Sequence, residues 1–149
     1  MTSKIPFLVG RTVLGGFFLY NGIHHFTARK AMASYVGSKK VPMPDAAVAV
    51  TGAALTLGGA SILLGIKPKA GVAALVGFLA GVSPIMHNFW SHEDPQRRQF
   101  ELVNFSKNMG LLGASLALRG VEEPWPKSVS SKHNGTRGRI RRAVSALAA

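Results

Sequence analysis

The chain has 149 residues, 47% of them hydrophobic, and it carries a formal net charge of +12 without any cysteine. This length is enough for one compact domain, and the lack of cysteine excludes disulfide bonds, thiolate chemistry and cysteine-bound iron–sulfur clusters. The charges are segregated from long apolar stretches rather than scattered, which is unlike a soluble domain.

The first apolar span runs from Ile5 to Thr27, and its only Lys or Arg is Arg11. A secretory signal would also place basic residues ahead of an apolar core. However, His24 and His25 stand where small residues should mark a cleavage site. We therefore interpret this span as a helix of the folded protein.

Two stretches without any charged residue follow, at 46–66 and 70–90. At ~1.5 Å per residue, a helix of about 21 residues is ~30 Å long, which matches the hydrocarbon thickness of a bilayer. Both stretches are therefore expected to be transmembrane helices. A fourth, weaker span runs from Phe100 to Leu118 and contains Glu101 and Lys107.

The four spans predict an all-α fold, a four-transmembrane-helix bundle of up-and-down topology over residues 1–120. Small residues spaced four apart support close helix packing, and we expect them in the interior of the bundle. The pairs are Ala54 with Gly58, Gly77 with Gly81, and Gly110 with Ala114.

Residues 121–149 form a basic tail that ends in "RGRIRRAVSALAA". The tail is either a partly disordered cytoplasmic end or an interfacial helix, in which Arg139, Arg141 and Arg142 contact anionic lipid headgroups or an acidic partner. Arg11 is likewise expected to bind a lipid phosphate or a carboxylate of a partner subunit. Nucleic acid is not an expected partner, because no folded reader or aromatic platform accompanies the charge.

The distribution of Lys and Arg predicts the orientation in the membrane. Ten of these residues lie in the N-terminus, the second loop and the tail, and six lie in the first and third loops. The positive-inside rule therefore places both termini in the cytoplasm. The excess of Lys and Arg on the side of the termini comes from the tail, since the short loops alone would favour the reverse orientation.

An up-and-down topology brings polar residues from three spans to one leaflet. The first span and the third both end there, and the fourth begins there. Eight polar side chains are expected to converge at this level, and they are Asn21, His24, His25, His87, Asn88, Asn104, Lys107 and Asn108. Polar groups at membrane depth are costly, so the cluster is our candidate ligand site.

A quinone is the ligand class that suits this cluster best. Its two carbonyl oxygens accept hydrogen bonds from His, Asn or Lys, and a histidine can relay the protons that reduction requires. A b-type haem held by His25 and His87 is less well supported, because the sequence does not choose between His24 and His25. No metal is expected, since no HxxxH or HxxH spacing places two ligands on one helix face.

Four segments together resemble the DoxX family of small four-helix membrane proteins, over roughly residues 6–119. The segments are "GRTVLGGFFLYNGIHHF", "MPDAAVAVTGAALTLGGASILLGIKPKAG", "SPIMHNFW" and "NFSKNMGLLGASLAL". The resemblance implies a bacterial inner-membrane protein associated with redox assemblies, such as quinone-linked thiosulfate oxidation and oxidant-defence complexes. It does not imply a set of catalytic residues.

Two functions remain open at this point. One is an integral membrane subunit of a quinone-linked redox or electron-transfer complex, with quinone bound in the polar cluster. The other is a non-catalytic accessory subunit of a larger respiratory or photosynthetic membrane complex. The chain has no cysteine, nucleotide motif or paired buried carboxylates, so it is not expected to be an enzyme on its own. A small transporter or lipid-modifying protein is a third class that the polar cluster allows, but four short helices leave little room for alternating access.

Overall fold

The computed structural model describes residues 4–127, and these form five α-helices, one short 3-10 turn and no β-strand. The elements are α1 (Ile5–Thr27), α2 (Arg29–Ser38), α3 (Pro44–Leu64), α4 (Pro68–Met86), η1 (Phe89–Ser91) and α5 (Pro95–Arg119). The all-α prediction is confirmed, and each predicted span corresponds to one long helix. The short helix α2 was not expected, because its ten residues carry no long apolar run.

Prolines and a capping carboxylate fix where the long helices begin. Proline stands at the start of α3, α4 and α5. At that position a backbone N–H would have no acceptor within the helix, so the lack of an N–H in proline costs no hydrogen bond. At α5, the Asp94 carboxylate accepts a hydrogen bond of 2.7 Å from the backbone N–H of Arg97. Near the other end of α4, Pro84 has no N–H to continue the helical hydrogen bonds. The helix ends at Met86, so His87 and Asn88 leave its axis.

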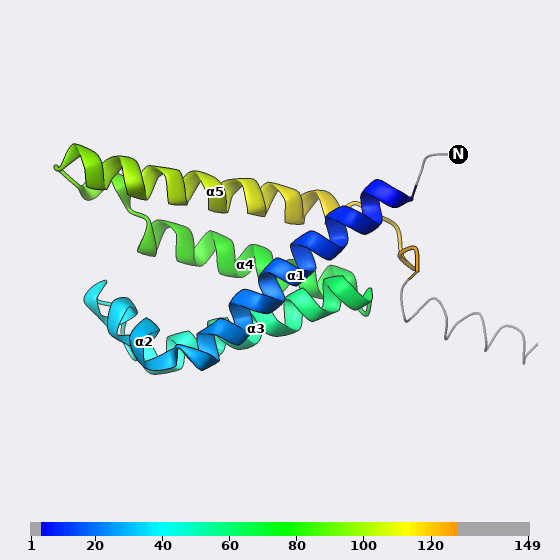
Figure 1. Ribbon diagram of the computed structural model, residues 1–149, viewed down its shortest axis with the longest axis horizontal. Helices are drawn as coiled ribbons and strands as arrows, with labels where there is room; N and C mark the ends of the chain where they lie inside the picture. The colour runs from blue at the N-terminus through cyan, green and yellow to red at the C-terminus, as the bar shows by residue number, and fades with distance from the viewer. Residues whose placement is uncertain (1–3, 128–149) are drawn as a thin grey trace, which may run out of the picture.

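The four long helices run alternately in opposite directions along the molecule (Figure 1). Helix α1 crosses α3, whereas α4 and α5 lie side by side and antiparallel. The start of α1 and the last described residues lie at one end of the molecule, and α2 lies at the other. The ends of α1 and α4 and the starts of α3 and α5 therefore meet at the end that carries α2.

Glycines allow α1 and α3 to pack backbone against backbone. A Cβ atom on Gly59 would lie 2.5 Å from the Leu19 nitrogen, and one on Gly15 would lie 3.0 Å from the Gly59 carbonyl oxygen. Gly58 lets α4 pack closely on α3, as predicted, because a Cβ on it would lie 2.9 Å from Leu75 Cδ2 and 3.2 Å from the Gly71 carbonyl oxygen. The close helix packing expected at Gly77, Gly81 and Gly110 was wrong, because no neighbouring helix lies within 4 Å of a Cβ built on any of them. Gly77 and Gly81 instead line a cavity between the helices.

The packed core extends past residue 120, where the helical domain was expected to end. Trp125 is fully buried and lies edge-on to Phe7, with ring centroids 5.4 Å apart. It joins a core of apolar side chains from α1, α3 and α4, namely Leu14, Phe18, Leu55, Ile62, Val72, Leu75 and Leu79. The segment after α5 is thus part of the fold at least as far as Trp125.

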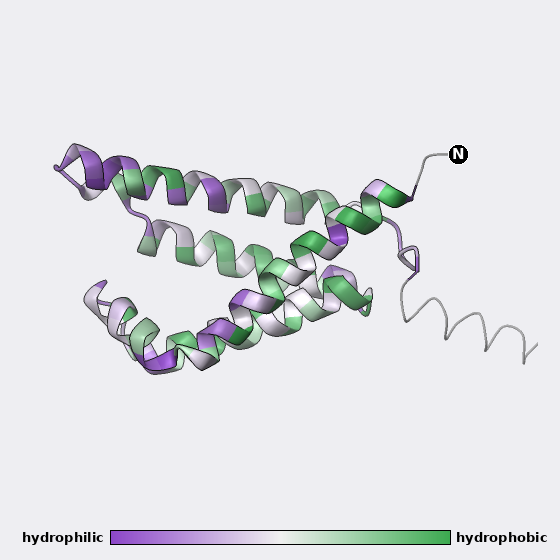
Figure 2. Cartoon of the chain, in the orientation of Figure 1, coloured by the Kyte–Doolittle hydropathy of each residue, from purple (hydrophilic) through white to green (hydrophobic). Residues whose placement is uncertain are grey.

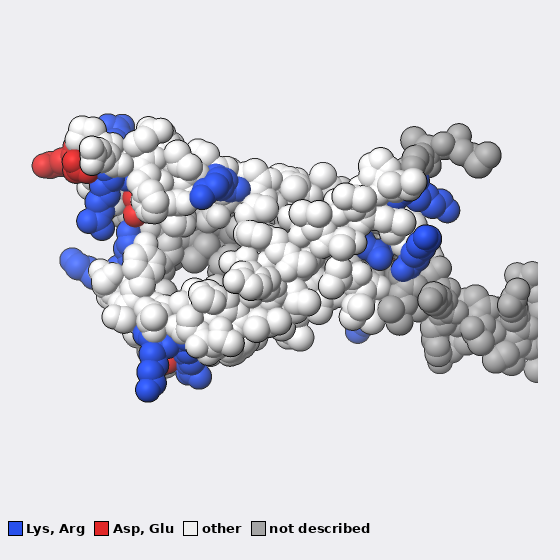
Figure 3. All heavy atoms as spheres, viewed as in Figure 1, with Lys and Arg blue, Asp and Glu red and all other residues white. Residues whose placement is uncertain are grey.

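Two of the helical segments, Pro44–Leu64 and Pro68–Ser91, are long and apolar enough to cross a membrane. Only 33% of the most apolar stretch of each is buried, whereas a core helix of a soluble protein is mostly buried. On α3, for example, Val50 and Leu57 are exposed. Apolar residues cover much of the long helices (Figure 2), and charged side chains gather at the two ends of the molecule (Figure 3). A broad, largely uncharged belt lies between those ends.

Candidate functional site

A cavity of about 450 Å³ opens between the long helices at the end of the molecule that carries α2. Its wall is mainly apolar and includes Phe18, Leu55, Phe78 and Leu111 among others. Four of the eight predicted site residues also line this cavity, and they are Asn21, His25, His87 and Asn108. The structure therefore brings residues from α1, α5 and the end of α4 to one space, although they are distant in sequence.

The other four predicted residues do not line the cavity. His24 is exposed and stacks on Tyr20, with ring centroids 6.3 Å apart. Asn104 donates a hydrogen bond of 3.1 Å to the Phe100 carbonyl oxygen one turn earlier, and Lys107 is exposed on α5. Asn88 lies just before η1, and its buried Oδ1 has no hydrogen-bond partner among the described residues.

Of the two adjacent histidines of α1, His25 lines the cavity and His24 does not. Its Nδ1 lies 2.8 Å from the backbone oxygen of Asn21. A carbonyl oxygen can only accept, so Nδ1 carries the hydrogen and donates it. In the neutral ring, Nε2 is then an acceptor. The ring lies edge-on to Phe78 across the cavity wall, with centroids 6.3 Å apart.

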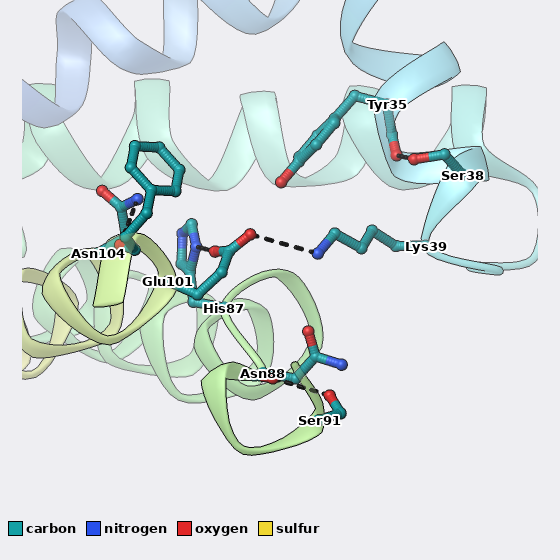
Figure 4. A network of polar contacts seen from close by, with 9 residues as sticks. Tyr35, Ser38, Lys39, His87, Asn88, Ser91, Glu101 and Asn104 are labelled. Carbon is teal, nitrogen blue, oxygen red and sulfur yellow. Dashed lines mark hydrogen bonds and ion pairs between the residues drawn. The ribbon is translucent and has the colours of Figure 1, made fainter. Parts of the chain in front are cut away.

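His87 is held by a buried carboxylate that the sequence analysis did not include in the site. Its Nδ1 lies 2.8 Å from Glu101 Oε2, and Lys39 Nζ lies 3.6 Å from Glu101 Oε1 (Figure 4). Glu101 is only 4% exposed. It was treated as an interruption of the fourth span, although an acid within an apolar span is itself a sign of function. What the sequence could not show was that Lys39 and His87 would meet it.

The sequence of the chain also matches a known protein family. The family model for DoxX matches residues 7–88, which include most of α1, all of α2, α3 and α4, and both His25 and His87. The chain belongs to the DoxX family. It is therefore a membrane protein of the DoxX type, as the resemblance implied. No curated protein and no solved structure matches the chain.

In this DoxX protein, the match ends before α5, so it does not include Glu101 or Asn108. Both residues nevertheless belong to the site, because Asn108 lines the cavity and Glu101 forms a hydrogen bond with His87. Part of the polar wall of the cavity therefore depends on a helix that lies outside the matched region.

Tyr35, which the sequence analysis also missed, lines the cavity itself. It lies on α2, and its hydroxyl points toward the pair of Glu101 and Lys39 (Figure 4). Partial burial raises the pKa of the Tyr35 phenol above its ordinary value, the negative charge of Glu101 raises that pKa further, and Arg97 opposes the rise. The ammonium of Lys39 also lies over the ring, 5.8 Å from its centroid.

Arg11 lies away from the cavity, at the other end of the molecule, and has a partner within the chain. Its Nη1 donates a hydrogen bond of 3.0 Å to the Pro126 carbonyl oxygen, and its guanidinium lies 5.9 Å from the centroid of the Phe7 ring. The residue is 6% exposed. This internal contact was not predicted. The tail residues expected to contact lipid or a partner, Arg139, Arg141 and Arg142, lie outside the described residues.

Proposed function

We propose that this DoxX protein is a four-span integral membrane subunit of a quinone-linked redox complex in the bacterial inner membrane. In this proposal, the ring of a quinone or its reduced form occupies the cavity at the α2 end. The observation that carries the proposal is the cavity itself, which combines an apolar wall with two imidazoles and two amides.

The lengths of all four long helices support four membrane crossings. Helices α1 and α5 contain charged residues, but with 23 and 25 residues they are ~35 Å long or more, as far as a bilayer requires. The alternating directions place the start of α1 and the end of α5 on the same side (Figure 1). With both ends in the cytoplasm, the cavity lies toward the outer leaflet.

The size and chemistry of the cavity suit a quinone-class ring. Small-molecule sites are typically apolar cavities of a few hundred Å³ with a small number of polar groups that fix orientation. A quinone is a flat, lipid-soluble ring with one oxygen at each end. His25 on α1 and His87 after α4 approach the cavity from different helices, so they can contact opposite ends of such a ring.

The proposal is tested by replacing one residue from each side of the polar wall. We expect His87→Ala and Asn108→Ala to reduce the amount of quinone extracted per purified polypeptide, and to weaken decylubiquinone binding in lipid nanodiscs. His24→Ala is the matched control, because His24 is exposed outside the cavity. Unchanged binding in both cavity variants, with the helical content intact, would remove the quinone proposal.

An accessory role in a larger respiratory or photosynthetic complex is the second candidate. It is favoured by Gly110 and Gly113 on α5, because both are exposed and no neighbouring helix lies within 4 Å of a Cβ built on either of them. Exposed glycines allow another transmembrane helix to approach closely.

Mild solubilisation of native membranes, followed by a native gel and mass spectrometry, tests the accessory role. Co-migration with redox or photosynthetic subunits is the expected result, and migration alone would count against it. A chain that ends at Lys127 tests whether residues 128–149 are needed for assembly. This end point keeps Trp125, so a failure to assemble would not be caused by loss of the core.

A further inference from the structure

Both histidines of the cavity have their Nδ1 hydrogen engaged elsewhere in the protein. His25 donates it to the Asn21 carbonyl oxygen, and His87 donates it to the Glu101 carboxylate. In a neutral imidazole, one nitrogen donates and the other accepts. Each ring therefore presents an Nε2 lone pair, and not an N–H group, as the atom that remains for a ligand.

We propose that the cavity selects the reduced quinol form of the ring, whose two hydroxyl groups donate hydrogen bonds to the Nε2 atoms of His25 and His87. Glu101 is the positioning residue that fixes the tautomer of His87. This inference rests on the proposed function, since it assigns an oxidation state to the ligand proposed for the same cavity.

The two oxidation states differ in the polar groups that they offer. A quinol has hydroxyl hydrogens and satisfies both imidazole acceptors, whereas the oxygens of a quinone can only accept. A bound quinone would place two acceptors against two acceptors and leave buried lone pairs unsatisfied. The Tyr35 hydroxyl and the Asn108 amide can either donate or accept. They contribute to binding of both forms, so the two imidazoles decide the selection.

The neighbours of Glu101 explain why it acts as an acceptor toward His87. Lys39 Nζ lies 3.6 Å from Oε1, and its positive charge favours the ionised carboxylate. An ionised carboxylate accepts hydrogen bonds and cannot donate them. It therefore holds the hydrogen of His87 on Nδ1. A glutamine at this position could instead donate to Nδ1, and the ring could then present Nε2–H to the cavity.

The experiment compares three probes on the full-length protein in nanodiscs, at about pH 8, where an ordinary imidazole is neutral. The probes are decylubiquinol under anaerobic conditions, decylubiquinone, and the dimethyl ether of decylubiquinol, which keeps the reduced ring but has no hydroxyl hydrogen. Equilibrium dialysis against empty nanodiscs corrects for partition into lipid. We expect the quinol to bind about tenfold more tightly than either of the other probes, which corresponds to roughly one satisfied hydrogen bond.

The variant Glu101→Gln should reduce the ratio of quinol to quinone affinity toward one without abolishing quinone binding. A role in folding alone would weaken both probes equally and leave the ratio unchanged. Asp45→Asn is the matched control, because Asp45 is an exposed acid at the same end of the molecule, paired with Arg29 at 2.9 Å, and its loss should not change the ratio.

The possible outcomes separate the two proposals. Binding of quinone and quinol with equal affinity by the unmodified protein would overturn the selection of the quinol while leaving the proposed function in place. The same holds if the ether binds as tightly as the quinol. If none of the three probes binds, the proposed function is wrong and this inference is wrong with it.

Discussion

Each end of the molecule buries one ionisable group, but only one of the two groups lies beside a cavity. At one end, Arg11 is enclosed by Phe7 and the segment around Trp125 and donates to the Pro126 carbonyl oxygen. At the other end, Glu101 is just as buried, but its partner His87 borders an open cavity. Burial alone therefore does not identify a site. What distinguishes the second end is that His87, the partner of the buried carboxylate, lines a cavity into which a ligand fits.

The largest expected effect comes from a pair of glycine variants. Gly59→Leu places a side chain against the Leu19 backbone and should separate α1 from α3, which lowers the free energy of unfolding by about 4 kcal/mol or more. A Cβ on Gly77 meets no neighbouring helix within 4 Å, and Gly77 lines the cavity. Gly77→Leu should therefore change stability by about 1 kcal/mol or less, while its side chain occupies the ligand space and ligand binding is lost.

Unfolding of both glycine variants in mixed micelles, followed by circular dichroism, measures the difference in stability. If Gly77→Leu destabilised the protein as much as Gly59→Leu, Gly77 would be as tightly packed as Gly59, and the open space beside α4 would be wrong.

The next largest effect is expected at the two tryptophans. Trp125→Ala removes a fully buried ring and should lower the free energy of unfolding by about 3 kcal/mol, because the void at the end of the bundle collapses only in part. Trp90→Ala is the control, since Trp90 is 55% exposed on η1. The measurement is denaturant unfolding in micelles. Equal stability of the two variants would show that the segment after α5 does not contribute to the core.

The smallest effect is a pH dependence at Tyr35. Because the pKa of its phenol is raised in the folded protein, the neutral form is favoured by folding. The resulting stabilisation is fully present below the unfolded pKa of about 10, and it is lost as the pH rises through the higher folded pKa. Between about pH 9 and pH 11, the unmodified protein should therefore lose more stability than Tyr35→Phe. The measurement is the free energy of unfolding of both proteins at several pH values in this range. If it changed with pH equally in the two proteins, burial and Glu101 would not raise the pKa of this phenol.

Several features were predictable from the sequence because they depend on local pattern. The charge-free stretches predicted α3 and α4, and each of these helices begins at a proline. The alternation of spans predicted that His25 and His87 would reach the same end of the molecule, and both line one cavity. The short helix α2 lacked an apolar run, so no periodic signal revealed it or placed Tyr35 near the site.

The sequence by itself determined the long helices, their order and the family to which the chain belongs, because apolar length and spacing are properties of consecutive residues. Only the tertiary structure decided that His25 rather than His24 faces the cavity, that Glu101 holds His87, and that Trp125 closes the opposite end. Those outcomes depend on the rotation of each helix about its axis and on contacts between residues far apart in the chain. The close packing of α1 on α3 at Gly15 and Gly59 contributes to setting that rotation, and no local pattern encodes it.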